Sequence, residues 1–148
     1  MRRLLIFGLL VSIGLLVSGF GLSVVHGQGY GDALLGAMEK ARRLKCQNNL
    51  KQIHAALERY RGSAGGWPSD LNALVQKKLI DVKLLKCPSA ASPAGSIDFV
   101  FRKPASGNGE EIIVYDKATN HSGGCNVLQL DGTTQWLTTA QFKKRMGG

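Results

Sequence analysis

Residues 46–60 read CQNNLKQIHAALERY, and the apolar members of this stretch recur every three or four positions. That spacing places them along one side of an α-helix, with polar or small residues between them. A helix with a single apolar face has to bury that face against another layer of structure. The stretch therefore predicts a helix that anchors the core through Cys46, Leu50, Ile53, Leu57 and Tyr60.

The predicted helix extends from this stretch in both directions, over residues 32–61. The interval holds no Pro and is rich in Ala, Leu, Lys, Arg, Gln and Glu, all good helix formers. Asp32 is a candidate N-cap, and Gly62 begins a glycine-rich run that would end the helix. A second apolar stripe lies about a third of a turn from the first, so we expect the two ends of the helix to contact different partners. This second stripe consists of Leu34, Met38, Ala41 and Leu44.

Residues 4–25 carry no charge and consist mainly of Leu, Ile, Val, Phe and Gly. As a helix, such a segment would be about 33 Å long, which is enough to cross a bilayer core. Residues 1–27 therefore predict either an uncleaved transmembrane anchor or a secretory signal peptide cut near Gly27. The glycines of residues 27–31 predict a flexible joint, with residues 28–31 leading into a domain over 32–148.

The second half of the chain changes to strand periodicity after one more short helix over 71–78. Apolar residues alternate at 97–102, and a second strand is expected at 111–115. Thr138 or Thr139 would cap a last short helix. Helices followed by about four antiparallel strands predict an α+β fold in which the long helix covers a small antiparallel sheet.

A hairpin is predicted between residues 126–130 and 133–137, because Asp131-Gly132 separates two alternating runs. A two-residue loop would pair Leu130 with Thr133 and Val127 with Trp136.

The net charge of +9 is carried largely by the long helix. A solvated helix face is the main interpretation of such a charge run, and contact with anionic lipid headgroups is the alternative. No recognised nucleic-acid motif accompanies the charge, so no nucleic-acid partner is expected.

The three cysteines, Cys46, Cys87 and Cys125, cannot all pair within one chain. The chain folds back at Trp67-Pro68, and export would place it where disulfides persist. We therefore predict a Cys46–Cys87 bridge with Cys125 free. Three buried, reduced thiols are the competing expectation, since free Cys behaves as a small hydrophobic residue.

His121, Cys125 and Asp131 are the residues with the greatest potential for catalysis or metal binding. A Cys–His nucleophile needs a third, orienting group, and none can be assigned. A zinc site needs three or four ligands, and only the pair His121 and Cys125 is evident. Asp131 is favoured in its turn for conformational reasons. The prediction is a protein that is not an enzyme, with no catalytic residue, no confident metal ligand and no identified small-molecule substrate.

The run ARRLKCQNNLKQI at residues 41–53 resembles the helix of bacterial prepilin-like proteins, relatives of type IV pilins and type II secretion pseudopilins. The segments 65–68 and 87–89 are similar to further elements of that group. The most specific match is His121, nine residues, then Asp131 and Gly132, which resembles the His-x9-Asp-Gly signature. The resemblance covers about residues 31–140. The N-terminus departs from the family pattern, because Gly8 lacks the usual Phe-Thr-Leu-Ile-Glu type of start and the first Glu is Glu39.

The resemblance implies a pseudopilin-like α+β fold and a structural or interaction role in a type II secretion or type IV pilus-like system. Other pseudopilin-like or secretion-system proteins would be the partners. The chain would be a single-pass inner-membrane protein held through residues 4–25, with its domain in the periplasm. The alternative is a domain that kept the fold without filament assembly, either tethered or secreted to the periplasm after cleavage near Gly27. Some pseudopilins bind calcium, for which Asp116, Asn120 and Asp131 offer oxygen ligands. No other cofactor is expected.

Overall fold

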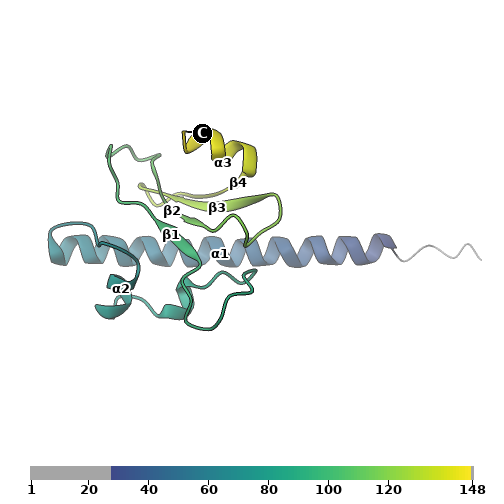
Figure 1. Ribbon diagram of the computed structural model, residues 1–148, viewed down its shortest axis with the longest axis horizontal. Helices are drawn as coiled ribbons and strands as arrows, with labels where there is room; N and C mark the ends of the chain where they lie inside the picture. Colours follow the sequence, from purple (N-terminus) through teal and green to yellow (C-terminus); the bar gives the residue numbers. More distant parts are fainter. Residues whose placement is uncertain (1–27, 148) are drawn as a thin grey trace, which may run out of the picture.

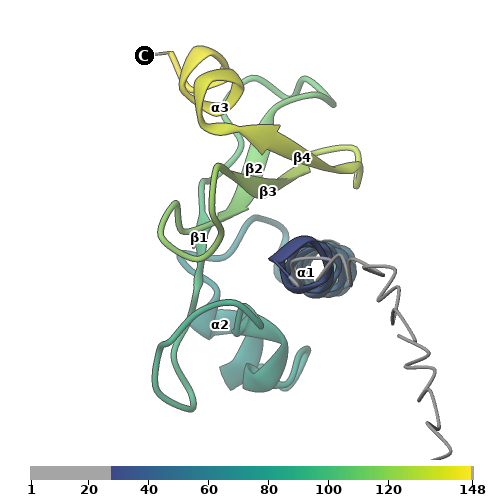
Figure 2. The same ribbon diagram turned by 90° about the vertical axis from the view of Figure 1, so that its right-hand side faces the viewer.

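The computed structural model describes residues 28–147 and confirms an α+β fold with one long helix and a four-stranded antiparallel sheet. Helix α1 lies between the sheet on one side and the segment that carries α2 on the other, as Figures 1 and 2 show. In chain order the elements are α1 (Gln28–Ala64), α2 (Asn72–Gln76), the 3-10 helix η1 (Val82–Leu85), β1 (Phe99–Phe101), β2 (Ile112–Asp116), β3 (Gly124–Gln129), β4 (Thr134–Thr138) and α3 (Thr139–Arg145).

Helix α1 is longer than the sequence predicts at both ends. Residues 28–31, expected to form a joint, are its first turn, so the expectation that Asp32 is the N-cap is wrong. Once a long helix is nucleated, each added Gly costs only about 1 kcal/mol, which does not stop propagation. Gly62 is also helical, and the helix ends instead at Ala64, where the next residue, Gly65, has a φ of 71° and donates its N–H to the carbonyl of Arg61.

The predicted apolar stripe of α1 forms the centre of the core. Cys46, Leu50, Ile53 and Leu57 are fully buried, and Tyr60 packs at the margin. They lie against Ile113, Val114 and Leu128 of the sheet and against Leu71, Leu74 and Leu85 from the α2–η1 segment. The opposite face of the sheet is covered by α3, where Phe142 and Met146 pack on Ile112, Cys125, Val127 and Leu137.

The four strands pair in sequence order, β1-β2-β3-β4. The predicted hairpin between β3 and β4 exists, but its register is wrong by one residue, because Val127 pairs with Gln135 and Asn126 pairs with Trp136. A two-residue loop of the expected kind needs positive φ at both Asp131 and Gly132. Only Gly132 has it, at 87°. Gln129 donates its N–H to the Thr133 carbonyl, so the loop has three residues.

The short helices differ in extent from the prediction but not in position. Helix α2 stops at Gln76 rather than near residue 78, because Lys78 adopts a left-handed φ of 55°. The N–H of Leu79 then bonds to the Leu74 carbonyl and that of Lys78 to Val75, a Schellman closure. Helix α3 is capped by Thr138, one of the two expected residues, which forms a reciprocal capping box with Gln141.

The predicted membrane segment, residues 4–25, lies outside the described residues, as does Gly27. Within residues 28–147, no helix is both long and apolar enough to cross a membrane.

The burial of the stripe predicts the effect of shortening its side chains. Leu50→Ala or Ile53→Ala should lower the free energy of unfolding by about 2–5 kcal/mol, because each leaves a cavity between α1 and the sheet. Leu34→Ala is the matched control: it removes the same atoms from the same helix, where the side chain is 63% exposed. Urea denaturation followed by circular dichroism measures all three. Equal effects for Leu34→Ala and Leu50→Ala would contradict this account of the core.

Candidate functional site

Four metal-ligating side chains meet inside the protein, between α1 and the sheet. Cys46 comes from the middle of α1, Cys87 follows η1, Asp116 ends β2, and His121 lies in the loop before β3. All four are buried, and one ligand atom from each lies within 4.8 Å of the others. Residues far apart in the sequence are thus brought to one point by the packing of the sheet on the helix.

The His121 imidazole is the hub of this cluster. Its Nδ1 lies 2.6 Å from Glu39 Oε1. Its Nε2 lies 3.3 Å from Cys87 Sγ, 3.4 Å from Cys46 Sγ and 3.3 Å from Asp116 Oδ2. The ring also meets the edge of Trp136, with the ring centroids 5.6 Å apart. Both ring nitrogens therefore have partners, and the orientation of the ring is fixed on all sides.

Two further contacts hold the acidic groups. Asn126, at the centre of β3, donates its backbone N–H to Asp116 Oδ1 at 3.0 Å and its side-chain amide to Oδ2 at 2.8 Å. Glu39 accepts a bond from Ser89 and forms an ion pair with Arg43. Arg43 in turn lies 3.8 Å over the Trp136 ring and donates to the Ser122 carbonyl, which covers the cluster from outside.

The cluster shifts the pKa of each of its titratable sulfur and nitrogen groups. Burial opposes the charged form of His121, but hydrogen bonds to Asp116, Cys87 and Glu39 outweigh it and raise its pKa to about 10. The hydrogen bond from Cys46 lowers the pKa of Cys87 to about 5 in spite of burial, with help from His121. Donating that bond raises the pKa of Cys46, which keeps its proton.

Burial and hydrogen bonding also act in opposite directions on the pKa of Glu39. Burial alone would raise the pKa of the Glu39 carboxyl, but bonds from His121, Ser89 and Arg43 lower it. The lowered pKa favours the ionised form of Glu39, which accepts the hydrogen bond of the His121 Nδ1–H.

The cysteines have the arrangement of the competing expectation, three buried thiols, and the pair predicted to form a bridge lies in contact. The sulfur atoms of Cys46 and Cys87 do meet, at 2.9 Å, but all three cysteines are free thiols. Cys125 lies on the α3 side of the sheet, packed with Ile112 and Leu137. Burial and the nearby Asp116 charge raise its pKa to about 12. The bonds of His121 go to Cys46 and Cys87 rather than to its sequence neighbour Cys125.

The two ends of the predicted signature lie on either side of β3, and each contacts α1. His121 precedes the strand and meets Cys46. Gly132 follows it and packs against His54, whose Nε2 bonds to the Leu130 carbonyl at 3.2 Å. Asp131 is exposed and closes the turn by accepting the N–H of Thr133 at 2.8 Å. His121 and Gly132 thus hold the two ends of β3 against α1.

The three calcium candidates do not share a partner among the described residues. Asp116 binds Asn126 in the cluster, and Asn120 donates to the Asp98 carbonyl at 3.1 Å. Asp131 lies at the hairpin turn. Each of the three side chains thus has a different hydrogen-bond partner. Their arrangement gives no geometric support to the expected calcium site.

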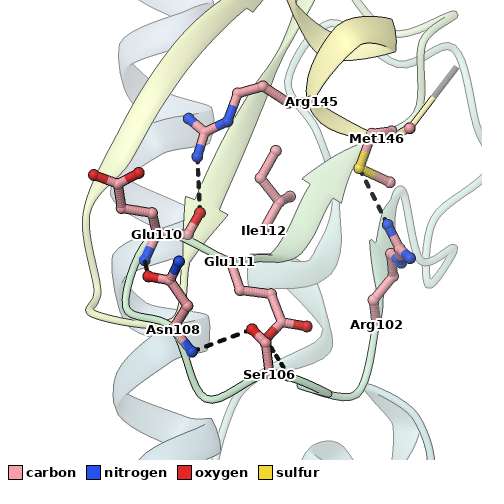
Figure 3. Close-up of a pocket in the computed structure, with 9 residues that line it drawn as sticks. Arg102, Ser106, Asn108, Glu110, Glu111, Ile112, Arg145 and Met146 are labelled. Carbon is pink, nitrogen blue, oxygen red and sulfur yellow. Dashed lines mark hydrogen bonds between the residues drawn. The ribbon is translucent and has the colours of Figure 1, made fainter.

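Two hollows on the surface are lined by other residues than those of the buried cluster, apart from Cys87. The hollow in Figure 3 encloses 410 Å³ between the β1–β2 loop and the end of α3. Its polar groups bind one another: Glu111 accepts from Ser106, Arg145 donates to the Glu110 carbonyl, and Arg102 contacts Met146 Sδ. A smaller hollow of 340 Å³, lined by Lys45, Asn49, Lys83, Leu84, Lys86 and Pro88, reaches Cys87.

Comparison with known proteins gives one match, which covers part of the chain. Residues 36–72 match the profile of a family described as "Protein of unknown function (DUF1559)", a family associated with prepilin- and pseudopilin-like proteins. The matched segment is the core half of α1 with the turn that follows it. Comparison with curated proteins and with solved structures gave no match.

The sequence analysis missed Glu39, Asn126 and His54, and it did not connect Asp116 with His121. One local signal existed: Glu39 lies seven residues before Cys46, which puts the two on one face of the helix. The other contacts join residues from separate elements and leave no trace in the local spacing.

The contact of Gly132 with His54 predicts the effect of adding one methyl group. Gly132→Ala should lower the free energy of unfolding by about 2 kcal/mol or more, because it combines a left-handed backbone with a Cβ 2.9 Å from His54. Gly107→Ala is the control, with a φ of 70° and open space around it, and should cost about 1 kcal/mol. Chemical denaturation of both variants checks this. A Gly132→Ala cost no larger than the control would show that the His54 contact is dispensable.

Proposed function

We propose that the protein is a non-enzymatic, pseudopilin-like subunit of a type II secretion or type IV pilus-like system. Its task is to associate with neighbouring subunits through the N-terminal half of α1. Residues 4–25 hold it in the bacterial inner membrane, and the domain lies in the periplasm. The proposal is supported by the helix-on-sheet fold and the match at residues 36–72, but one structural observation carries it.

That observation is the uncovered apolar stripe at the start of α1. Tyr30, Leu34 and Leu35 are 80%, 63% and 65% exposed, and Met38 and Leu44 are also exposed. The first turns of α1 extend past the sheet, as Figure 1 shows. Apolar side chains grouped on one surface are typical of an interaction site. The second predicted stripe, Leu34, Met38, Ala41 and Leu44, is thus exposed and has no partner within the described part of the chain.

A second copy of the same chain is the occupant that fits this stripe. The stripe begins a few residues after the apolar sequence of residues 4–25, so in neighbouring membrane-held subunits equivalent helices would lie alongside one another. Polar side chains are present on the same half of α1, with Glu39 beside Arg42 and Arg43. A parallel, staggered pair of such helices can bury the apolar residues and leave the charges in water.

Photo-cross-linking in the membrane tests this assembly. A photoreactive amino acid at Leu34 or Met38 of the full chain should give adducts of twice the chain mass. The same probe at Gln52, exposed on the same helix outside the stripe, should give few. Leu35→Asp should reduce the yield at Leu34, because a buried charge at a helix interface is costly. Monomers alone at Leu34, or equal yields at Leu34 and Gln52, would favour the tethered or secreted binding domain that does not assemble.

N-terminal sequencing of the mature protein separates the modes of attachment. A start near Leu9 indicates pilin-type processing, and Met1 indicates an uncleaved anchor. A start at Gln28 indicates secretion to the periplasm and would remove the membrane part of the proposal. The alternative function, a periplasmic binding domain without filament assembly, would then replace the subunit role.

A further inference from the structure

We propose that Cys46, Cys87, Asp116 and His121 form a tetrahedral binding site for a single zinc-class divalent cation. This inference stands apart from the assembly role, because it concerns the buried cluster and not the exposed stripe.

The spacing of the ligand atoms is close to that of a tetrahedral zinc site. Zinc–ligand bonds of 2.0–2.3 Å at tetrahedral angles would put sulfur and nitrogen about 3.5 Å apart, nitrogen and oxygen about 3.3 Å apart, and two sulfurs about 3.8 Å apart. The observed distances from His121 Nε2 are 3.3 and 3.4 Å to sulfur and 3.3 Å to Asp116 Oδ2. The two sulfurs, 2.9 Å apart, have to separate by about 1 Å, and all four ligand atoms lie within 4.8 Å of one another.

The bonds around the cluster turn the ligand atoms inward. Glu39 Oε1 accepts the Nδ1–H of His121 at 2.6 Å, which leaves the Nε2 lone pair facing the two sulfurs and Asp116. A carboxylate on the outer nitrogen is the usual support of a metal-binding histidine. The backbone N–H of Asn126 holds Asp116 Oδ1, and its side-chain amide donates to Oδ2, which also lies 3.3 Å from His121 Nε2.

The charge balance of the cluster calls for a cation. With Nδ1 as the donor, His121 Nε2 and Asp116 Oδ2 are both acceptors, and two lone pairs face each other across 3.3 Å in a buried space. The side-chain amide of Asn126 donates to that oxygen at 2.8 Å and lies 3.4 Å from the nitrogen, and a metal ion bound by both acceptors would remove the repulsion that remains between them. A divalent ion would also offset two of the three negative charges of two thiolates and one carboxylate, whose burial without a counter-charge is unfavourable.

The ligand set selects the class of metal and the role. Two sulfurs, one imidazole and one carboxylate suit zinc and other borderline transition metals, whereas calcium and magnesium require oxygen ligands. Four protein ligands fill a tetrahedron and leave no open position, which is typical of structural sites. The hollow that reaches Cys87 provides a route for the ion from solvent. A structural ion at this point would join α1, the η1 segment and the sheet.

A disulfide between Cys46 and Cys87 is the competing use of the same sulfurs. It would consume both thiolates and exclude the ion. It would leave His121, Asp116 and their supporting bonds without a role, so the full set of contacts favours the metal. The two states differ in mass and in thiol count, and one experiment can therefore separate them.

Cobalt(II) titration of the full, reduced chain in detergent tests the site. We expect the visible absorption of tetrahedral cobalt and a sulfur-to-cobalt charge-transfer band, saturating at one equivalent, with zinc displacing the cobalt. Elemental analysis of protein purified without chelator should then find close to one zinc per chain. Octahedral cobalt spectra, or no binding by the reduced wild-type chain, would overturn the proposal. So would native protein that already contains the Cys46–Cys87 disulfide.

Variants assign the ligands. Cys46→Ser and Cys87→Ser should abolish the charge-transfer band, whereas Cys125→Ser, a buried thiol on the other face of the sheet, should leave it unchanged. Glu39→Gln removes a positioning residue only, so it should retain the tetrahedral spectrum with zinc affinity lowered about 10–100-fold. An unchanged affinity in Glu39→Gln together with an unchanged spectrum in Cys87→Ser would place the ion elsewhere and overturn the assignment.

Discussion

The burial of one face of α1 is the constraint on which the rest of the structure depends. Its core half, from Cys46 to Leu57, is covered by the sheet on one side and by the α2–η1 segment on the other. The sheet forms a smaller apolar cluster with α3, but its strands contribute Ile113, Val114 and Leu128 to the larger cluster that α1 organises. The short helices, the strands and the loops therefore serve to place the sheet and the α2–η1 segment on two sides of α1.

The cluster around His121 adds buried hydrogen bonds to this apolar packing. It lies where α1, the η1 segment and the sheet meet, so each layer supplies at least one of its members. A buried polar group stabilises a fold only when all its partners are in place, and it specifies their positions strictly. Asn126 illustrates this positional constraint. It donates to Asp116 through both its backbone and its side chain, and its own Oδ1 has no partner among the described residues.

The features recoverable from the sequence are those that local spacing determines. The helical stripe, the sheet of four strands and the Thr138 cap follow from periodicity and turn chemistry, and all three are present. Local rules were less reliable where two conformations are close in energy. Gly29 and Gly31 were absorbed into α1, and Asp131 kept a negative φ, which moved the hairpin register by one. The candidate site was missed because Glu39 and His121 are 82 residues apart and Cys46 and Cys87 are 41 apart, distances over which pattern carries no information.

The sequential order of the strands has a consequence for how the protein folds. Each strand pairs with its neighbour in the chain, so the sheet can form through short loop closures, and α1 can form by itself. The slow step is then the docking of these two preformed units, which brings together residues from opposite ends of the domain. The His121 cluster is assembled only at that step, because its contacts cross the interface between the units. Disruption of the cluster should therefore accelerate unfolding more than it slows formation of the helix or the sheet.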